Sequence, residues 1–312
     1  MRVVFMGSPE FAVPTLEALQ GAYEVVGVVT QPDRPAGRGL GLRPPPVKRL
    51  AQEAGLPVIQ PVRLRDPEAM AALHDWAPDA IIIAAYGQIL RQEVLDLPPR
   101  GCLNLHASLL PRWRGAAPIQ AAILHGDRET GVTLIKMDAG LDTGPILAQR
   151  VLPIRDDDTG GSLSQRLAQA GAELVLQALP DHFAGRLTPR PQAEALATYA
   201  PLLRKADGAL DFTRGAAELA RRVRAFDPWP GCCFTWRGRR IAVLKARAEE
   251  GMAPAPGQVS ALNGEPVIGT ADGWLVLEVL QPEGRSPMPA VEFARGARHF
   301  TGNHLFPTEL PP

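Results

Sequence analysis

The chain has 312 residues, more than a single hydrophobic core usually serves, so two domains are expected. Hydrophobic residues make up 46% of it and charged residues 21%, which is the composition of an ordinary globular protein and excludes a disordered chain. The 33 basic and 33 acidic residues cancel, and this balance argues against a uniformly basic surface for nucleic acids.

The first half of the chain alternates between apolar runs typical of strands and segments with helical periodicity. Strands are predicted over Arg2–Met6, Glu24–Thr30, Val58–Ile59, Ala80–Ala85, Gly101–Leu105 and Val132–Met137. Helices are predicted over Phe11–Leu19, Val47–Ala54, Pro67–Trp76, Ile89–Leu95, Pro118–Leu124 and Ser162–Ala184. Repeated strand–helix units predict an α/β domain with a doubly wound, mostly parallel sheet over residues 1–186. Ligands bind such sheets beyond the carboxyl ends of the strands.

The second half has a different pattern. Residues 187–205 are rich in proline and polar residues and lack periodicity, which indicates a linker. One amphipathic helix is then predicted over Ala216–Phe226. Short strands are predicted over Cys233–Trp236, Arg240–Lys245, Gly257–Ala261, Val267–Gly269 and Trp274–Leu280. Five short strands with glycine-containing turns predict a smaller C-terminal OB-like β-barrel domain over residues 206–312.

A long basic loop follows the second predicted strand. It runs from Gln31 to Lys48 and carries Arg34, Arg38 and Arg43 among several glycines. Long loops in compact domains are usually functional or disordered. A flexible basic loop that orders on binding suits RNA phosphates and unpaired bases, whereas a merely solvated loop is the alternative.

The most informative run is residues 104–118 (NLHASLLPRWRGAAP), which follows a predicted buried strand. Asn104 and His106 are two residues apart, so on a strand their side chains leave the same face. An amide can donate to a developing oxyanion, and an imidazole can shuttle a proton near neutral pH. Asp142, in the turn LDTGP, is placed to orient the histidine. The alternative is a structural histidine, a capping asparagine and an ordinary turn aspartate.

The whole pattern favours the catalytic interpretation. Asn104, His106 and Asp142, with Ser-Leu-Leu-Pro at 108–111 between them, resemble the signature of the 10-formyltetrahydrofolate-dependent formyltransferases. The longer run through Gln120 is similar to the members of that family that act on tRNA, and the resemblance extends over essentially the full chain.

The resemblance implies transfer of the formyl group of 10-formyltetrahydrofolate to the amino group of initiator Met-tRNA, with no metal required. Asn104 would donate to the tetrahedral oxyanion, and His106 would supply or relay the proton. Asp142 would hold His106 and an ordered water. The resemblance also places the folate's pterin pocket at residues Tyr86, Gly87, Ser108, Leu109, Leu110 and Pro111.

The basic loop belongs to the same resemblance. Residues 34–39 are similar to the loop with which the tRNA formyltransferases grip the acceptor end, so Arg34, Arg38, Arg43 and Lys48 are the candidate tRNA-binding residues. The sequence departs from the family pattern at residues 40–42, where Leu-Gly-Leu replaces frequent lysines. The C-terminal domain is expected to bind the tRNA as well.

Two other functions remain open. One is a formyltransferase of the same family that acts on a small amine, such as a nucleotide-linked amino sugar or glycinamide ribonucleotide; the basic loop and the C-terminal domain argue against it. A non-catalytic RNA-binding module is the other, and the intact Asn104, His106 and Asp142 argue against that. Binding of NAD is not expected, because Gly7-Ser8-Pro9-Glu10 lacks the G-x-G-x-x-G spacing.

The expected location is the cytoplasm. The three cysteines (Cys102, Cys232, Cys233) show no metal-binding spacing, which favours a reducing compartment. The chain enters its first strand directly after Met1, without a signal or transit pattern, and no apolar run is long enough to cross a membrane. A monomer with no membrane partner is expected.

Overall fold

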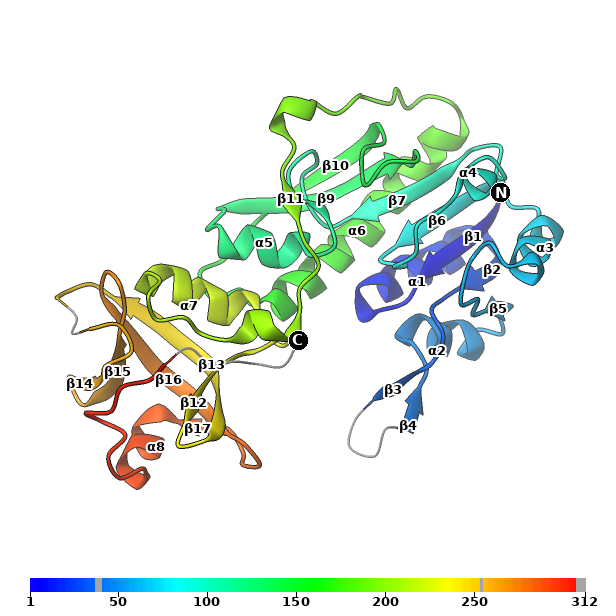
Figure 1. Cartoon of the computed structure of the whole chain (residues 1–312). Helices are drawn as coiled ribbons and strands as arrows, with labels where there is room; N and C mark the ends of the chain where they lie inside the picture. Colours follow the sequence, from blue (N-terminus) through cyan, green and yellow to red (C-terminus); the bar gives the residue numbers. More distant parts are fainter. Residues whose placement is uncertain (37–40, 253–254, 307–312) are drawn as a thin grey trace. The chain divides into compact units, whose positions relative to one another are not determined.

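The computed structural model describes residues 1–36, 41–252 and 255–306 and divides into two compact units (Figure 1). The first unit comprises Met1–Pro118, Glu129–Pro153 and Ser164–Ala200. The second comprises Ile119–Arg128, Ile154–Leu163 and Pro201–Pro312. The expectation of an α/β fold with two domains is therefore confirmed.

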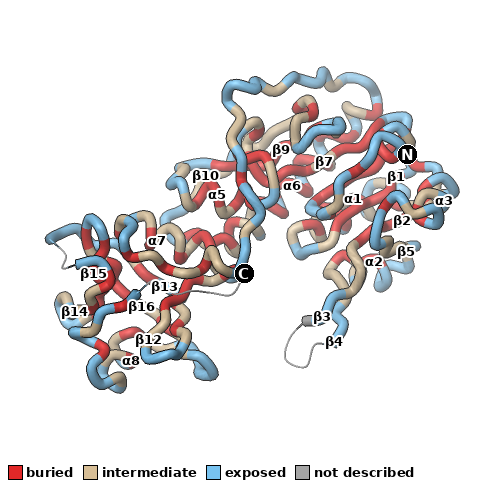
Figure 2. Tube along the Cα trace, in the orientation of Figure 1, coloured by how far each residue is buried: buried red, intermediate tan, exposed pale blue. Residues whose placement is uncertain are grey.

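A seven-stranded sheet forms the core of the first unit, in the order β10-β9-β7-β6-β1-β2-β5. Its strands are β1 (Arg2–Gly7), β2 (Glu24–Val29), β5 (Val58–Ile59), β6 (Ala80–Ala84), β7 (Cys102–His106), β9 (Glu129–Lys136) and β10 (Ile146–Pro153). The first five are parallel, while β9 is antiparallel to both β7 and β10. Because the apolar residues of β6 are buried on both faces, that strand was recognisable from its sequence (Figure 2).

The edge strand β10 was not predicted. Only Ile146 and Leu147 at its start are buried, and Gln149 and Arg150 interrupt its apolar pattern. A half-exposed edge strand gives a weaker periodic signal than a strand covered on both faces.

Helices cover both faces of this sheet. They are α1 (Val13–Ala22), α2 (Pro46–Glu53), α3 (Pro67–Trp76), α4 (Gln92–Leu95) and α6 (Gly160–Phe183), preceded by the 3₁₀ turn η1 (Glu10–Ala12). On one face, Leu73 of α3 and Val94 of α4 pack against Met6 and Ile83. On the other face α6 approaches β7, since a Cβ atom added at Gly171 would lie 2.5 Å from Leu105 Cδ2.

The predicted helix over residues 89–95 is wrong in its first turn. Only Gln92–Leu95 is helical, and Ile89 is 86% exposed. Gly87 has a φ of 84°, so the chain leaves β6 through an irregular turn. Ile89 thus lies outside the apolar face that α4 turns to the core.

The second unit is built on a six-stranded antiparallel sheet. Its strands are β12 (Cys232–Trp236), β13 (Arg239–Glu249), β14 (Val259–Leu262), β15 (Glu265–Gly269), β16 (Trp274–Pro282) and β17 (Met288–Pro289), and its helices include α5 (Pro118–Leu124), α7 (Ala216–Ala225) and α8 (Ala290–Gly296). Phe234, Phe293 and Phe300 pack together in its core with ring centroids 5.1–6.1 Å apart. All five strands and the helix predicted in this half are confirmed, whereas β17 and α8 were not predicted.

Residues 187–200, which looked like a linker, belong to the first unit. They include the 3₁₀ turn η2 (Glu194–Leu196) and β11 (Tyr199–Ala200), which pairs in parallel with β8 (Arg114–Gly115). The 3₁₀ turn η3 (Lys205–Gly208) follows in the second unit. The domain boundaries proposed from the sequence stay a prediction. Within the described part of the chain, each helix is too short or too polar to span a bilayer.

Candidate active site

The carboxyl end of β7 carries the first two predicted site residues. Asn104 and His106 lie on the face of β7 opposite to Leu105, because side chains alternate along a strand. His106 is only 6% exposed, and Asn104 is half-buried. The β strand thereby holds both polar side chains on one rigid element.

Asp142 reaches the same point from the loop between β9 and β10. Its Oδ1 accepts a hydrogen bond of 3.4 Å from Asn104 Nδ2. Its Oδ2 lies 3.6 Å from His106 Nδ1 and accepts a 2.9 Å hydrogen bond from the backbone N–H of Gly115. The structure therefore brings together the three side chains that the sequence singled out, although 36 residues separate the last two.

The orientation of His106 follows from its second nitrogen. Nε2 lies 2.8 Å from the backbone carbonyl oxygen of Trp113. A carbonyl oxygen only accepts, so Nε2 must carry the hydrogen and donate it. In the neutral ring this leaves the lone pair on Nδ1, the nitrogen that faces Asp142. Trp113 reaches this position with a φ of 60°, a conformation that bulky residues seldom adopt.

Asp142 also has an unusual backbone, with a φ of 54°. Non-glycine residues in the left-handed region persist only where their surroundings hold them, and such positions gather at functional sites. Gln192 Nε2 provides the restraint, because it donates 2.7 and 2.8 Å hydrogen bonds to the carbonyl oxygens of Asp142 and Gly144. Sequence reasoning missed Gln192, since it lies in the segment interpreted as a linker.

The loop after β7 is packed rather than open. Ser108 donates a 2.6 Å hydrogen bond to the Arg112 carbonyl oxygen, and Leu110 lies in a small core with Ile135 and Ile146. Thr133 Oγ1 accepts from Leu110 N–H and donates to the Ser108 carbonyl oxygen. Of the predicted folate residues in this loop, Ser108 and Leu110 are buried, and Leu109 and Pro111 are half-buried.

The other predicted folate residues follow β6. The Tyr86 ring is buried, and burial raises the pKa of its phenol above the ordinary value. Within the described ranges its hydroxyl has no hydrogen-bond partner, which is unusual for a buried polar atom. Tyr86 is tied to the end of β2 because its carbonyl oxygen accepts a 3.2 Å hydrogen bond from Gln31 Nε2.

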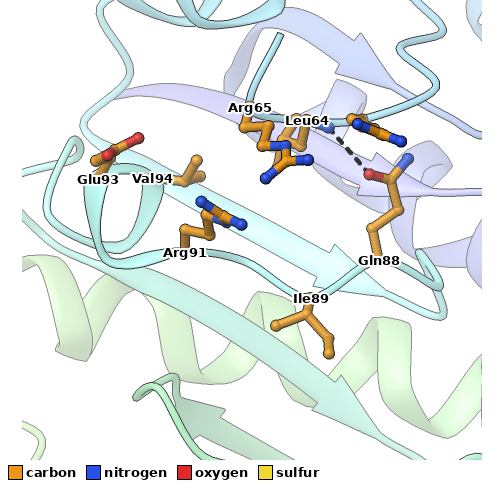
Figure 3. A pocket seen from close by; sticks show the side chains of 8 residues that line it. Leu64, Arg65, Gln88, Ile89, Arg91, Glu93 and Val94 are labelled. Atoms are coloured by element: carbon orange, nitrogen blue, oxygen red, sulfur yellow. Dashed lines mark hydrogen bonds between the residues drawn. The ribbon is translucent and has the colours of Figure 1, made fainter.

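A cavity of about 250 Å³ lies beside this turn (Figure 3). Its lining is strongly cationic and comprises Arg63, Leu64, Arg65, Gln88, Ile89, Arg91, Glu93 and Val94. Gln88 closes one side by accepting a 3.0 Å hydrogen bond from Leu64 N–H, drawn as the dashed line in Figure 3. Sequence reasoning missed the three arginines, because Arg63 and Arg65 come from the loop between β5 and α3, whereas Arg91 comes from the segment between β6 and α4.

The predicted basic loop contains a hairpin, β3 (Arg34–Ala36) with β4 (Gly41–Arg43). Arg34 and Arg43 are exposed and directly opposite each other in its register. Arg38 lies outside the described residues. Lys48 is engaged differently, because its Nζ lies 2.9 and 2.8 Å from the two carboxylate oxygens of Asp33. That contact lowers the pKa of Asp33.

Nearly the whole chain is similar to known proteins of one family. Residues 1–179 match the family model described as formyl transferase, and residues 202–298 match the formyl transferase C-terminal domain. A methionyl-tRNA formyltransferase of Thermus thermophilus is 50% identical over 309 residues, which cover 98% of this chain and 99% of the relative. One of Roseiflexus castenholzii is 48% identical over 310 residues, with 98% and 99% covered.

Solved structures show the same fold. HypX from Aquifex aeolicus in complex with tetrahydrofolic acid aligns with a TM-score of 0.62 at 21% identity. The alignment covers 97% of this chain and 48% of that one. Identity this low speaks for the fold alone.

Proposed function

This chain belongs to the formyl transferase family, and on that premise we propose that it moves the formyl group of 10-formyltetrahydrofolate to the amino group of the methionyl residue of initiator Met-tRNA. The observation that carries the proposal is the meeting of Asn104, His106 and Asp142 at the end of β7. The two named relatives support Met-tRNA as the acceptor. Both are methionyl-tRNA formyltransferases, and this chain matches nearly the full length of each.

The reaction joins the amine nitrogen of Met-tRNA to the formyl carbon and breaks the bond between that carbon and N10 of the folate. Negative charge develops on the formyl oxygen as the amine adds. The Asn104 amide is the donor that meets this charge, since it lies half-exposed at the strand end. The hydrogen bond to Asp142 is long at 3.4 Å, so the amide is readily redirected to a substrate oxygen.

Proton transfer falls to His106. The nucleophilic amine loses a proton as the new bond forms, and N10 gains one as it leaves. Nδ1 of His106 is the free basic atom, because Nε2 is held by the Trp113 carbonyl oxygen. The Asp142 carboxylate, 3.6 Å from Nδ1, stabilises the imidazolium that forms in between.

One assay tests the proposal directly. Purified protein with 10-formyltetrahydrofolate should formylate Met-tRNA and leave free methionine, a nucleotide-linked amino sugar and glycinamide ribonucleotide essentially unmodified. Formylation of a small amine in preference to Met-tRNA would replace this acceptor with another. Binding of tRNA without any transfer would instead support an RNA-binding module.

The proposed donor site extends from the Tyr86 turn and the loop 108–111 into the cationic cavity. A folate carries carboxylates on its glutamate end, at the opposite end from the pterin. The cavity offers Arg63, Arg65 and Arg91 against a single acidic residue, Glu93. Guanidinium groups bind carboxylates in a bidentate manner, so the cavity is chemically suited to that end of the donor.

Arg65→Ala with Arg91→Ala is expected to raise the KM for the donor about 10-fold while the KM for Met-tRNA stays unchanged. A 10-fold rise corresponds to a loss of roughly 1.4 kcal/mol of binding free energy, which is consistent with the loss of two exposed ion pairs. Steady-state kinetics with a polyglutamylated donor measures it. Arg100→Ala, an exposed arginine away from the cavity, is the control. An unchanged donor KM in the double variant would remove the cavity from the donor site.

The hairpin β3–β4 is the proposed tRNA contact. Like charges directly opposite on paired strands destabilise the pair, and an isolated two-stranded hairpin is marginal in water. Arg34 and Arg43 nevertheless occupy opposite positions. Their arrangement is best explained by a polyanion that neutralises both, and RNA phosphates are such a ligand. Lys48, paired with Asp33, anchors the base of the loop in this proposal.

Arg34→Ala with Arg43→Ala is expected to raise the KM for Met-tRNA about 10-fold and to leave the donor KM unchanged. The dependence of the tRNA KM on salt should also weaken, by about one unit of log–log slope per arginine. Arg38→Ala is expected to act in the same direction. The matched control is Arg100→Ala with Arg186→Ala, which removes equal charge elsewhere on the first unit. An equal loss of donor affinity would instead identify the hairpin as a lid.

The proposed enzyme works in the cytoplasm as a monomer. Its three cysteines are free and buried, which suits a reducing compartment. Sedimentation of the purified chain tests the oligomeric state.

A further inference from the structure

Residues 190–200, here called the strap, lie between the segments that match the two family models. Their backbone follows the rim of the active site. Arg190 exchanges two hydrogen bonds with Ile146 at the start of β10, of 2.8 and 2.9 Å. At its other end, the carbonyl oxygen of Ala200 accepts a 2.9 Å hydrogen bond from Ala116 N–H. The strap therefore joins the Asp142 loop to the loop that follows β7.

Two strap side chains bind the backbone of the loops that carry the reacting groups. Gln192 Nε2 donates to the carbonyl oxygens of Asp142 and Gly144. Thr198 Oγ1 accepts a 2.9 Å hydrogen bond from the N–H of Trp113, the residue whose carbonyl oxygen holds His106. The first contact thus reaches the backbone of Asp142 itself, and the second reaches the residue that hydrogen-bonds His106.

Arg114 locks the strap in place. Its side chain is fully buried, and its guanidinium donates to Gln192 Oε1 and to both carboxylate oxygens of Glu194, at 2.9–3.1 Å. The hydrogen bonds to Glu194 raise the pKa of Arg114 above its ordinary value. A buried guanidinium needs all its donors satisfied, so Arg114 fixes which way the Gln192 amide faces. With Oε1 turned to Arg114, Nε2 must point at the Asp142 loop.

Gly115 shows how closely the strap approaches. A Cβ atom there would lie 2.6 Å from the Ala200 carbonyl oxygen, and the φ of Gly115 is 110°. Only glycine fits that position. The N–H of Gly115 donates to Asp142 Oδ2, so Gly115 contacts both the strap and the carboxylate.

We infer that Gln192 is a positioning residue: together with Arg114 it holds Asp142 in its left-handed conformation, and the strap is part of the catalytic scaffold rather than a linker. This inference rests on the proposed formyl transfer. Releasing the two carbonyl oxygens lets the Asp142 loop relax, which moves its carboxylate away from His106 and Asn104. A misplacement of about 1 Å in an active site can cost about 100-fold in rate.

Gln192→Glu is the sharpest test, because it is isosteric and keeps the acceptor for Arg114 while it removes the donor to the loop. The expected result is a 10- to 100-fold fall in kcat for Met-tRNA formylation, with both KM values unchanged. Thr198→Val, which removes the acceptor for Trp113, is expected to lower kcat in the same way. Gln169→Ala, an exposed glutamine on α6, is the control and should keep the wild-type kcat.

A double-mutant cycle separates positioning from a general loss of stability. If Gln192 acts through Asp142, adding Gln192→Glu to Asp142→Asn should cost little beyond the single change. Full additivity of the two losses would overturn the inference. So would wild-type kcat in Gln192→Glu and Thr198→Val, whatever their melting temperatures. A wild-type protein that formylates no amine would refute the proposed function instead.

Discussion

His106→Ala is expected to lower kcat by roughly 10²- to 10⁴-fold with the fold intact, the range for loss of a general acid–base group. The physical reason is that Nδ1 of His106 is the free basic atom beside Asp142, while Nε2 is committed to the Trp113 carbonyl oxygen. Single-turnover formylation of Met-tRNA measures the loss. Neither KM should change by more than a few-fold, because the imidazole, only 6% exposed, offers little surface for binding either substrate.

The control for this variant is His74→Ala, an exposed histidine on α3 that leaves the site untouched. Added imidazole should restore part of the lost rate in His106→Ala, since the substitution opens a space of matching shape. Near-wild-type turnover in folded His106→Ala would contradict the proposed proton transfer, and the reaction would then need another base.

Asn104→Ala should lower kcat by a similar factor, about 10²- to 10⁴-fold, because it removes the donor to the developing oxyanion. Asn104 also bonds Asp142, so the rate alone does not separate the two roles. Combining Asn104→Ala with Asp142→Asn does. Asp142→Asn alone should be slowed, because it releases His106. If Asn104 donates to the oxyanion, adding Asn104→Ala to Asp142→Asn should lower kcat by a further large factor.

The opposite outcome is equally clear. If Asn104→Ala costs nothing once Asp142 has been replaced, the amide serves only to hold the carboxylate. Circular dichroism and melting curves should show all these variants folded, because Asn104 is only half-buried at the end of its strand. Asp75→Asn on the exposed side of α3 is the matched control for the change at Asp142.

Local pattern was sufficient for most of the fold. The buried run of β6, the helix over Pro67–Trp76 and the five short strands of the second unit were all predictable, because periodicity and turn residues act within a few positions of each other. The helix predicted over 89–95 was wrong in its first turn, because the local pattern does not show the path of the backbone. An apolar residue such as Ile89 suggests burial, but only the path of the chain after Gly87 decides where it points.

In the candidate site too, some features follow from local sequence and others depend on the fold. Asn104 and His106 were identifiable together because a strand places residues two apart on one face. Asp142 was suggested by the resemblance and its turn, but its contact with them depends on the antiparallel pairing of β9 with β7. Lys48 was predicted to bind tRNA as part of the basic loop, and this stays a prediction; its ion pair with Asp33 could not be foreseen, because it depends on the fold.

Local patterns in the sequence were enough to predict the two-domain organisation, the alternation of strands and helices, and the placement of Asn104 and His106 on one face of β7, while the resemblance pointed to Asp142 in the turn after β9. The contacts that hold these three residues in place could be found only from the folded chain. Gln192 lies 50 residues beyond Asp142 and 78 beyond Arg114, in a stretch without periodicity. Hydrogen bonds between such distant segments leave no local pattern in a chain, because they form only after the sheet has brought the two loops to one rim.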